Sequence, residues 1–552
     1  MKKILVVGGV AGGASFSARA RRVSEKSQII MFDRGAFVSF ANCGLPYYVG
    51  NVIKEEENLI VATPELFKNR FNIEVRLRSE VLKVDRQMKE IEVKELETGR
   101  VYRESYDALV LAPGAAPIRP PLPGIDLEGI FALRTIPDSR RIREWIKTKK
   151  VSRAAIVGGG FIGLEMAENL VREGLEVSIV EMLPQVMPPL DAEMVEPVHA
   201  HLREKGVILS LGDGVEKFEK NTDGSLAVCT KSGKRVNAEL VILSIGVRPE
   251  TKLAVDAGLE IGERGGIRVD DQMRTSDPAI WAVGDAVEVR DVVTGQWTVI
   301  PLAGPANRQG RVAADAVFGR PSWFRGIQGT AVCGIFDMTV AMTGASEKTL
   351  LRNKIPFQKI YLHPGHHAGY YPDARPIDMK LLFNPDNGRI LGAQAVGFEG
   401  VEKRIDVIAM ALQKSGTVYD LEEAELCYAP QYGAAKDPVN VSGMIAANAL
   451  RGDAPVMQWA DALKEGVTLL DVRDPADYLA AHAEGALNIP LNDLRSRLTE
   501  IPGHKKVGVY CQVGQRAYYA VRVLRQNGMD AYNLSGGFKT GAAVKPSPAM
   551  PV

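Results

Sequence analysis

Residues 154–163 read Ala-Ala-Ile-Val-Gly-Gly-Gly-Phe-Ile-Gly, and this stretch decides the fold. A short apolar strand runs into a turn with Gly158, Gly160 and Gly163, and a helical pattern follows. Such glycines allow a tight turn and close approach of a pyrophosphate, to which the helix N-terminus offers N–H groups. Glu181 ends the next apolar run, where a carboxylate can bind ribose hydroxyls. The pattern predicts a βαβ dinucleotide-binding unit rather than a purely structural turn. The carboxylate favours NADH over NADPH because it would repel a 2′-phosphate.

Residues 3–33 repeat this pattern, with Val10 at the position of the middle glycine and Asp33 as the ribose acid. Residues 275–285 predict a strand that ends in Asp285, which can lie beside a flavin ribityl chain or be a simple turn residue. Two units predict two dinucleotides, a flavin and a nicotinamide. The predicted cofactor-binding residues are Gly8, Gly9, Gly12, Gly13, Asp33, Ala112, Gly114, Gly158, Gly160, Gly163, Glu181, Gly246, Gly284 and Asp285.

The bulk composition narrows the class of protein. The chain has 552 residues, which predicts three or four domains, and its 46% hydrophobic and 24% charged residues are ordinary for a soluble globular protein. A net charge of +1 gives no indication of a nucleic-acid partner. No apolar run is long enough to span a bilayer, and the apolar start runs directly into glycines, unlike a signal peptide. We therefore expect a cytoplasmic protein without a membrane partner.

Five scattered cysteines predict neither a disulfide framework nor a zinc site, and no metal is expected. Cys43 stands in the run Ser-Phe-Ala-Asn-Cys-Gly-Leu-Pro-Tyr-Tyr at 39–48, with no second cysteine four or five residues away. A redox partner for Cys43 would be the cofactor, oxygen or a thiol carried by the substrate. Pro46 suits a first helical turn, so we expect Cys43 at a helix start, with the dipole and the flavin lowering its pKa.

Positions 1 to about 447 resemble the flavoprotein pyridine nucleotide–disulfide oxidoreductases, since they carry both fingerprints, the Cys43 run and the 275–285 motif. Within that family, residues 39–47 resemble the single-cysteine branch, which contains coenzyme A-disulfide reductases, NADH oxidases and peroxidases. The oxidases and peroxidases carry a histidine where this chain has Ala11, which favours the coenzyme A branch. The resemblance implies bound FAD, NADH as reductant and coenzyme A in a mixed disulfide with Cys43.

The resemblance also implies contacts of coenzyme A with Ser15, Arg19, Arg22, Ser39 and Asn42. It implies a homodimer in which tyrosines of the partner subunit approach the cysteine. Tyr371 and Tyr428 are the candidates here, and a tyrosine hydroxyl can protonate a departing thiolate. Tyr370 is equally close in sequence to that position, and packed aromatic side chains are the alternative for each.

From about Met457 the chain resembles a rhodanese, in the runs 470–473, 482–490, 509–516 and 534–537. Cys511 follows a predicted strand and begins a six-residue loop. The other residues of this loop are Gln512, Val513, Gly514, Gln515 and Arg516. Backbone N–H groups and the following helix N-terminus would favour a thiolate there. Rhodaneses carry sulfur as a persulfide on this cysteine, and a silent cysteine is the alternative. Cys229, Cys333 and Cys427 are expected to be buried structural cysteines.

We thus expect an α/β protein with two Rossmann-like domains, an α+β dimerisation domain and an α/β rhodanese domain. The expected bounds are FAD-binding 1–118 and 249–323, NADH-binding 119–248, dimerisation 324–447, linker 448–456 and rhodanese 457–552. The expected activity is NADH-dependent reduction of small persulfide, polysulfide or disulfide substrates at Cys43, including coenzyme A persulfide, with sulfur transfer at Cys511. The alternatives are an NADH oxidase or peroxidase with a Cys43 sulfenic acid, and a flavin redox sensor whose rhodanese domain docks partners.

Overall fold

The computed structural model of the protein describes residues 2–464 and 466–543. Its chain divides into two compact units. The first unit consists of the residues up to Pro188 together with Leu202–Ile327, and the second of Pro189–His201 together with the residues from Gln328 onward. Within the described ranges, none of the helices combines the length and the apolar character that a membrane crossing requires.

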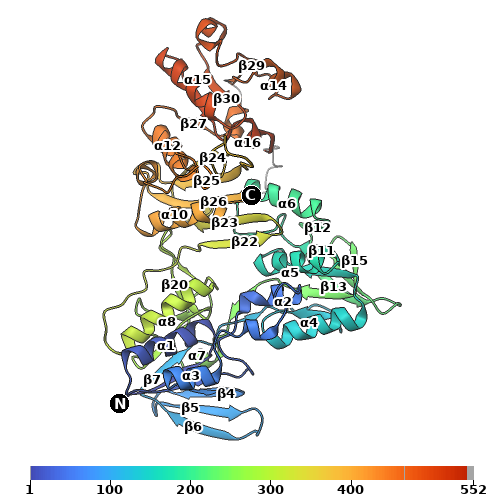
Figure 1. Cartoon of the computed structure of the whole chain (residues 1–552), viewed down its shortest axis with the longest axis vertical. Coiled ribbons are helices and arrows are strands. Elements are labelled where there is room, and N and C mark those ends of the chain that lie inside the picture. The colour runs from blue at the N-terminus through green and yellow to red at the C-terminus, as the bar shows by residue number, and fades with distance from the viewer. Residues whose placement is uncertain (1, 465, 544–552) are drawn as a thin grey trace. The chain divides into compact units, whose positions relative to one another are not determined.

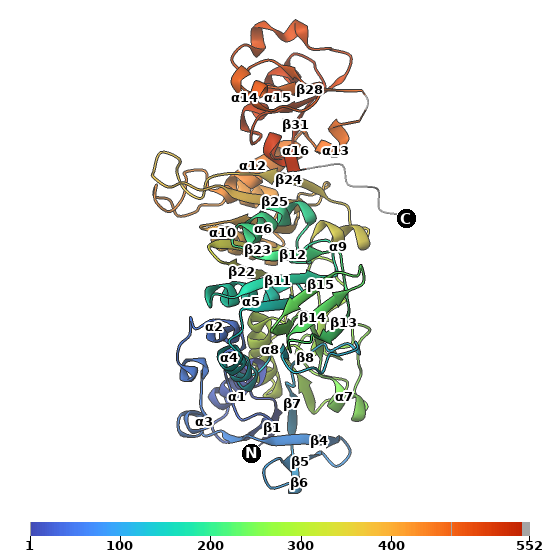
Figure 2. The same cartoon turned by 90° about the vertical axis from the view of Figure 1, so that its right-hand side faces the viewer.

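The first sheet of unit 1 is parallel and runs in the order β19-β7-β1-β2-β3. Helix α1 (Ala11–Val23) connects β1 to β2, which confirms the predicted N-terminal βαβ unit. Helix α8 (Ala303–Val317) lies beside α1 (Figures 1 and 2). The central strands β1 and β7 are apolar and buried, apart from Lys3 at the start of β1, because helices and loops cover both sheet faces. The strands are β1 (Lys3–Val7), β2 (Gln28–Phe32), β3 (Glu74–Arg76), β7 (Ala108–Leu111) and β19 (Ile280–Ala282).

The second sheet of unit 1 is also parallel, in the order β12-β11-β10-β16-β9. Helix α5 (Phe161–Arg172) connects β10 to β11, so the second predicted βαβ unit is confirmed. Helix α4 (Ile136–Lys149) begins with a capping box in which Thr135 and Asp138 bond each other's backbone. The strands are β9 (Ile130–Ala132), β10 (Arg153–Val157), β11 (Glu176–Glu181), β12 (Ile208–Leu211) and β16 (Leu240–Leu243).

Unit 1 also contains two antiparallel sheets of three strands each. One is formed by β4 (Ser79–Asp85), β5 (Glu90–Glu95) and β6 (Val101–Ser105), the other by β13 (Val215–Lys220), β14 (Leu226–Thr230) and β15 (Arg235–Ala238). Neither of these sheets carries a predicted site residue.

Unit 2 begins with an antiparallel sheet in the order β22-β23-β26-β25-β24. Helix α10 (Val401–Gln413) packs on β23 and β26, and Figure 1 shows it along that face. The predicted mixture of strands and helices is therefore confirmed. The other elements are β22 (Ala331–Ile335), β23 (Met338–Gly344), α9 (Glu347–Arg352), β24 (Gln358–Leu362), β25 (Ile377–Phe383), β26 (Ile390–Gly397), α11 (Val418–Glu422) and α12 (Pro438–Leu450).

The C-terminal part of unit 2 is a parallel sheet in the order β27-β31-β30-β28-β29. Helix α12 ends at Leu450 and β27 begins at Val456, so the expected linker overlaps both. The final residues of the expected rhodanese domain, 544–552, lie outside the described residues. The elements are β27 (Val456–Met457), α13 (Trp459–Ala462), β28 (Val467–Asp471), α14 (Pro475–Ala480), β29 (Leu487–Asn488), β30 (Lys506–Tyr510), α15 (Gln515–Gln526), β31 (Ala531–Leu534) and α16 (Gly537–Ala543).

Candidate active site

The Cys43 thiol stands in a single 3-10 turn, η1 (Asn42–Gly44), directly before helix α2 (Leu45–Val49). Pro46 lies in the first turn of α2, as predicted, because proline has no N–H to lose there. Helix α2 packs against α5 of the second nucleotide unit. The side chain of Cys43 reaches the surface. The thiol is thus accessible and is held between segments of both nucleotide units.

The electrostatic surroundings of Cys43 differ from the expectation. Partial burial raises the pKa of its thiol, and the carboxyl groups of Glu165 and Asp285 raise it further. We expected a helix dipole to lower the pKa of the Cys43 thiol. This expectation is wrong for the polypeptide alone, because α2 has five residues and begins after the thiol. Two acidic groups and a single turn therefore favour the neutral thiol.

Glu165 was missed by the sequence reasoning. It lies on α5, two residues after Gly163, and burial raises the pKa of its carboxyl to about 7, with Glu168 adding to the effect. A carboxyl group with a pKa near neutrality can hold or release a proton at working pH. The available signal was a glutamate on the helix that follows the second fingerprint, but nothing in the local sequence connects it with Cys43.

The predicted residues around the first nucleotide turn gather at one end of the sheet. Gly8 to Gly13 follow β1, Ala112 and Gly114 follow β7, and Gly284 and Asp285 follow β19. Ligands of open α/β sheets bind at the carboxyl ends of the strands. Gly284 donates its N–H to Gln309 Oε1 at 2.7 Å, and burial raises the pKa of Asp285. In unit 1 the structure thus brings Asp285 and Cys43 together. Gly246 follows β16 at the corresponding end of the second sheet.

The two predicted ribose acids are held in the same way. Asp33 accepts N–H groups from Gly9 at 2.9 Å and Gly35 at 2.8 Å, and Glu181 accepts them from Gly159 at 2.7 Å and Leu183 at 2.8 Å. A carboxylate offers about four lone-pair sites, so each acid keeps acceptor capacity for a ribose. Burial raises the pKa of Asp33 despite its two backbone partners.

The second turn fits a dinucleotide. A Cβ at Gly163 would overlap the carbonyl oxygen of Gly158, so helix–strand packing requires that glycine. A Cβ at Gly160 would meet none of the described atoms within 4 Å, so packing within the protein leaves this position open. That open space is where a pyrophosphate approaches the helix N-terminus. In the first turn, Gly13 packs against Gly8 in the manner of Gly163.

The residues expected to contact coenzyme A make contacts within unit 1. Arg19 forms an ion pair with Asp315 at 2.7 Å, and Ser15 donates a hydrogen bond to Asn307. Asn42 Nδ2 donates to the carbonyl oxygen of Arg134 at 3.2 Å. Arg22 is exposed at the end of α1, and Ser39 has a left-handed backbone, φ +47°. Arg22 is thus free to meet an anionic ligand, whereas Arg19 would share its guanidinium with Asp315. The coenzyme A role of all five remains a prediction.

The candidate tyrosines in unit 2 are exposed. Tyr428 and Tyr370 share a hydrogen bond between their hydroxyls, 2.6 Å long, which raises the pKa of Tyr370. The ring of Tyr371 packs edge-on against His367. The structure thus pairs the candidate Tyr428 with Tyr370, and the roles of Tyr371 and Tyr428 as acids remain a prediction.

The loop after β30 holds the second candidate thiol. Cys511 is 1% exposed, and the N–H of Gly514 points at its Sγ at 3.2 Å. Helix α15 begins at Gln515, so the loop is shorter than the six residues expected. The side chain of Gln512 accepts a hydrogen bond from Arg473 at 3.3 Å.

Beyond that loop, the first turn of α15 is tied to α14. Arg516 pairs with Asp474 at 3.1 Å and with Asp477 at 3.4 Å. The side chains of Val513 and Gln515 are exposed to solvent. The loop therefore offers the Cys511 sulfur the backbone N–H of Gly514.

Of the remaining cysteines, Cys229 and Cys333 are buried as expected. Cys427 is exposed, so its expected burial is wrong: it lies in an irregular segment after α11, away from any strand or helix.

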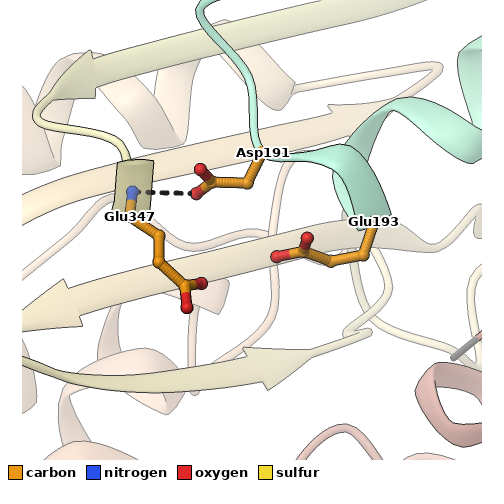
Figure 3. Close-up of side chains that lie close together, drawn as sticks. All are labelled: Asp191, Glu193 and Glu347. Atoms are coloured by element: carbon orange, nitrogen blue, oxygen red, sulfur yellow. Dashed lines mark hydrogen bonds between the residues drawn. The ribbon is translucent and has the colours of Figure 1, made fainter. Parts of the chain in front are cut away.

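A cluster of three acidic side chains in unit 2 was not predicted from the sequence. Asp191, Glu193 and Glu347 turn their side chains toward one region, and the N–H of Glu347 donates to Asp191 (Figure 3). Among the described residues this is the group that resembles a metal site. The ammonium group of Lys380, fully buried, bonds all three carboxylates and holds the place a cation would take. These charges keep the pKa of Lys380 above its ordinary value despite burial. The cluster is therefore a buried ion-pair network.

With this geometry in place, family comparisons are informative. Residues 2–310 match the pyridine nucleotide-disulphide oxidoreductase family, residues 330–437 the dimerisation domain of that family, and residues 456–543 the rhodanese-like domain. The chain belongs to the pyridine nucleotide-disulphide oxidoreductases and carries a C-terminal rhodanese domain. It is an oxidoreductase of a family that uses a flavin and NAD(P)H, and the predicted fold class is confirmed.

Known relatives narrow the class. A crystal structure of reduced Bacillus anthracis CoADR-RHD is 48% identical, covers 98% of each chain and has a TM-score of 0.96. A structure of a NAD-dependent persulfide reductase from A. fulgidus is 36% identical, covers 98% of this chain and 99% of that one, and has a TM-score of 0.90. The coenzyme A disulfide reductase of Staphylococcus haemolyticus is 33% identical over 80% of this chain and 99% of its own. A relative with another activity, the NADH oxidase of Methanocaldococcus jannaschii, is 35% identical over 80% of this chain and 97% of its own.

Proposed function

We propose that the protein reduces persulfides and disulfides of coenzyme A with NADH at Cys43, and that its rhodanese domain carries sulfane sulfur on Cys511. The observation that carries this proposal is the presence of two differently built thiol sites in one chain. Cys43 lies beside Glu165 and Asp285, and Cys511 lies under an amide N–H. The two relatives that match the chain over its full length support it, since one is described as CoADR-RHD and the other as a persulfide reductase.

The chemistry at Cys43 begins with its thiolate. It attacks the sulfur bonded to coenzyme A, forming a Cys43–coenzyme A disulfide and releasing hydrosulfide from a persulfide or coenzyme A from a disulfide. A bound flavin supplies two-electron transfer from NADH to sulfur. Reduction of the mixed disulfide then returns the Cys43 thiolate and frees coenzyme A. For a persulfide the sum is CoA-S-SH + NADH + H⁺ → CoA-SH + H₂S + NAD⁺.

Residues of the chain handle the protons of this cycle. Each leaving thiolate takes up a proton, and Glu165, with a pKa of about 7 beside Cys43, is placed to hold one. Tyr428 of the partner subunit is the second candidate acid. Neither role requires another protein thiol, because coenzyme A itself supplies the second sulfur.

The finer cofactor and partner assignments belong to the same proposal. FAD binds the first nucleotide unit through Asp33, and NADH rather than NADPH binds the second unit through Glu181. The matched dimerisation domain supports a homodimer. The substrates are small persulfides, polysulfides or disulfides, and the reducing cytoplasm, where Cys43 stays a thiol, is the expected location.

The test compares two substrates. Purified protein receives coenzyme A persulfide or coenzyme A disulfide, and NADH consumption and sulfide release are measured together. We expect one sulfide per NADH with the persulfide and a higher kcat/KM than with the disulfide. A much higher kcat/KM for the disulfide would overturn the persulfide preference while leaving the role of Cys43 intact.

A second candidate function is an NADH oxidase, which the relative from Methanocaldococcus jannaschii favours. Ala11 argues against it, since the resemblance places a histidine there in oxidases. Oxygen uptake by the purified protein with NADH alone, at a rate matching its sulfur reduction, would make this the better assignment.

A further inference from the structure

Within unit 2, the rhodanese domain covers an edge of the antiparallel sheet. Strand β24 is an edge strand, and edge strands expose backbone groups that lack a neighbour. Here rhodanese side chains form hydrogen bonds with these backbone groups. Ser535 Oγ accepts the N–H of Tyr361 at 2.9 Å, and Gln458 Nε2 donates to the carbonyl oxygen of Lys359 at 2.9 Å. Figures 1 and 2 show α16 of the rhodanese domain beside β24 and β25.

Side chains of α16 make a second row of contacts with the sheet. Asp378 on β25 accepts a hydrogen bond from His363 Nδ1 at 2.6 Å and forms an ion pair with Lys539. His363 Nε2 lies 2.8 Å from the hydroxyl of Thr540. Because Asp378 accepts the Nδ1 proton, the other nitrogen of a neutral His363 accepts the proton of Thr540. Although burial favours the neutral acid, His363 and Lys539 hold the pKa of Asp378 below its ordinary value.

The backbone at the start of α16 holds the loop of Cys511. The N–H of Phe538 donates to the carbonyl oxygen of Cys511 at 2.7 Å, and the N–H of Lys539 donates to that of Gln512 at 3.0 Å. A Cβ at Gly537 (φ +63°) would collide with the backbone of Cys511 and Gly514, so α16 lies directly against the loop. Lys539 thus holds the sulfur loop through its backbone and the sheet through its ammonium group.

The sheet that receives α16 is itself fixed. The hydroxyl of Tyr361 donates to Glu193 at 2.6 Å, and Glu193 belongs to the ion-pair network of Lys380. Tyr361 therefore joins Glu193, one of the three acids drawn in Figure 3, to the sheet edge at which Ser535 accepts a backbone N–H. A buried residue with partners on both sides has little freedom to move, so β24 is a rigid base for α16.

We propose that Asp378 and His363 are positioning residues for sulfur transfer at Cys511, acting through Lys539 and Thr540 on the loop of residues 511–514. Docking on the dimerisation domain holds α16, and α16 holds the carbonyl groups of Cys511 and Gln512, so that the N–H of Gly514 faces the sulfur. The sulfur-transfer competence of the rhodanese domain then depends on its docked position. This inference rests on the proposed persulfide role of Cys511.

The test uses full-length variants Asp378→Ala and Lys539→Met, with Lys464→Met as the matched control. Lys464 pairs with Asp461 in an exposed ion pair of the same domain. Sulfur transfer is measured from thiosulfate to cyanide. Cys511 thiolate takes the outer sulfur and releases sulfite, and cyanide then removes that sulfur as thiocyanate and restores the thiolate.

We expect kcat for thiocyanate formation to fall about tenfold in both variants, the factor that matches loss of one charge-assisted hydrogen bond. NADH-dependent reduction of coenzyme A disulfide should stay within about twofold of the parent, as it should in the control. Amide hydrogen exchange of residues 511–516 should rise in the two variants and stay unchanged in Lys464→Met. The conservative variant His363→Gln, whose amide keeps a donor and an acceptor, should retain more activity than His363→Ala.

Unchanged exchange and unchanged kcat in both Asp378→Ala and Lys539→Met would overturn the positioning role. A parent protein that forms no thiocyanate would refute the proposed role of Cys511 instead. In that case the exchange of residues 511–516 still decides whether docking orders the loop, and an unchanged exchange would overturn the inference by itself.

Discussion

The loops of Cys43 and Cys511 present their sulfur atoms in opposite surroundings. Cys43 is exposed, lies in a single turn and has Glu165 and Asp285 as its electrostatic neighbours. Cys511 is buried, and a backbone N–H three residues further along the chain faces its sulfur. Carboxylates disfavour a thiolate. The first thiol therefore needs a bound partner to become reactive, whereas the second sulfur faces a backbone N–H of its own loop.

This difference suggests a division of work. A thiol that stays neutral until substrate and cofactor are present does not react with whatever disulfide it meets, since the thiolate is the attacking form. A sulfur atom that faces a backbone N–H can hold a negatively charged persulfide until a sulfur acceptor arrives. The proposed reduction at Cys43 and storage at Cys511 follow from these surroundings.

The strongest test of the division is Cys43→Ser. We expect NADH-dependent reduction of coenzyme A persulfide to fall by a factor on the order of 10³ or more, because a serine hydroxyl cannot form the mixed disulfide. Flavin absorbance and thiocyanate formation should remain. If this variant reduces persulfide at the parent rate, the two thiols do not divide the work as proposed.

The reverse variant is Cys511→Ser. Thiocyanate formation from thiosulfate and cyanide should fall by about 10² or more, since the hydroxyl cannot carry sulfane sulfur. Reduction of coenzyme A disulfide should be unaffected. Cys427→Ser, which removes the exposed cysteine of unit 2, serves as the control. Thiocyanate formation by Cys511→Ser equal to that of the control would mean that another thiol carries the sulfur.

Weaker binding of NADH should affect the reduction at Cys43 and leave sulfur transfer at Cys511 unchanged. In Glu181→Ala the N–H groups of Gly159 and Leu183 lose their acceptor and the ribose loses its carboxylate. We expect KM for NADH to rise about tenfold, with a smaller rise for NADPH and no change in thiocyanate formation. Steady-state kinetics with both nucleotides measure this. Equal effects on NADH and NADPH would contradict the assignment of Glu181 to the ribose.

The smallest effect concerns the pKa of Cys43. Because the charge of Glu165 raises it, Glu165→Gln should lower it. The sign holds at alkaline pH because Glu165, with a pKa of about 7, is ionised where the thiol titrates. The pH dependence of Cys43 alkylation by iodoacetamide measures the shift, with the exposed Glu173→Gln on the same chain as control. An upward shift in Glu165→Gln would show that the carboxyl acts on the thiol in another way.

Several parts of the fold and site could be predicted because their causes are local. The turns at Gly158 and Gly8, the acids Glu181 and Asp33 at strand ends, and Cys511 after a strand follow from short-range periodicity and turn chemistry. The prediction that a helix dipole lowers the pKa of Cys43 was wrong, because a sequence gives neither the length of a short helix nor the acids that pack beside it.

The sequence by itself determined two dinucleotide-binding units, a lone cysteine behind the first of them and a rhodanese domain at the end. Only the tertiary structure decided what surrounds the lone cysteine, that Lys380 fills an acidic cluster, and that Lys539 joins the Cys511 loop to Asp378. The physical reason is range. Glycine turns and strand periodicity act over a few residues, whereas these charges come from segments that lie well apart in the chain and meet only when helices and sheets pack.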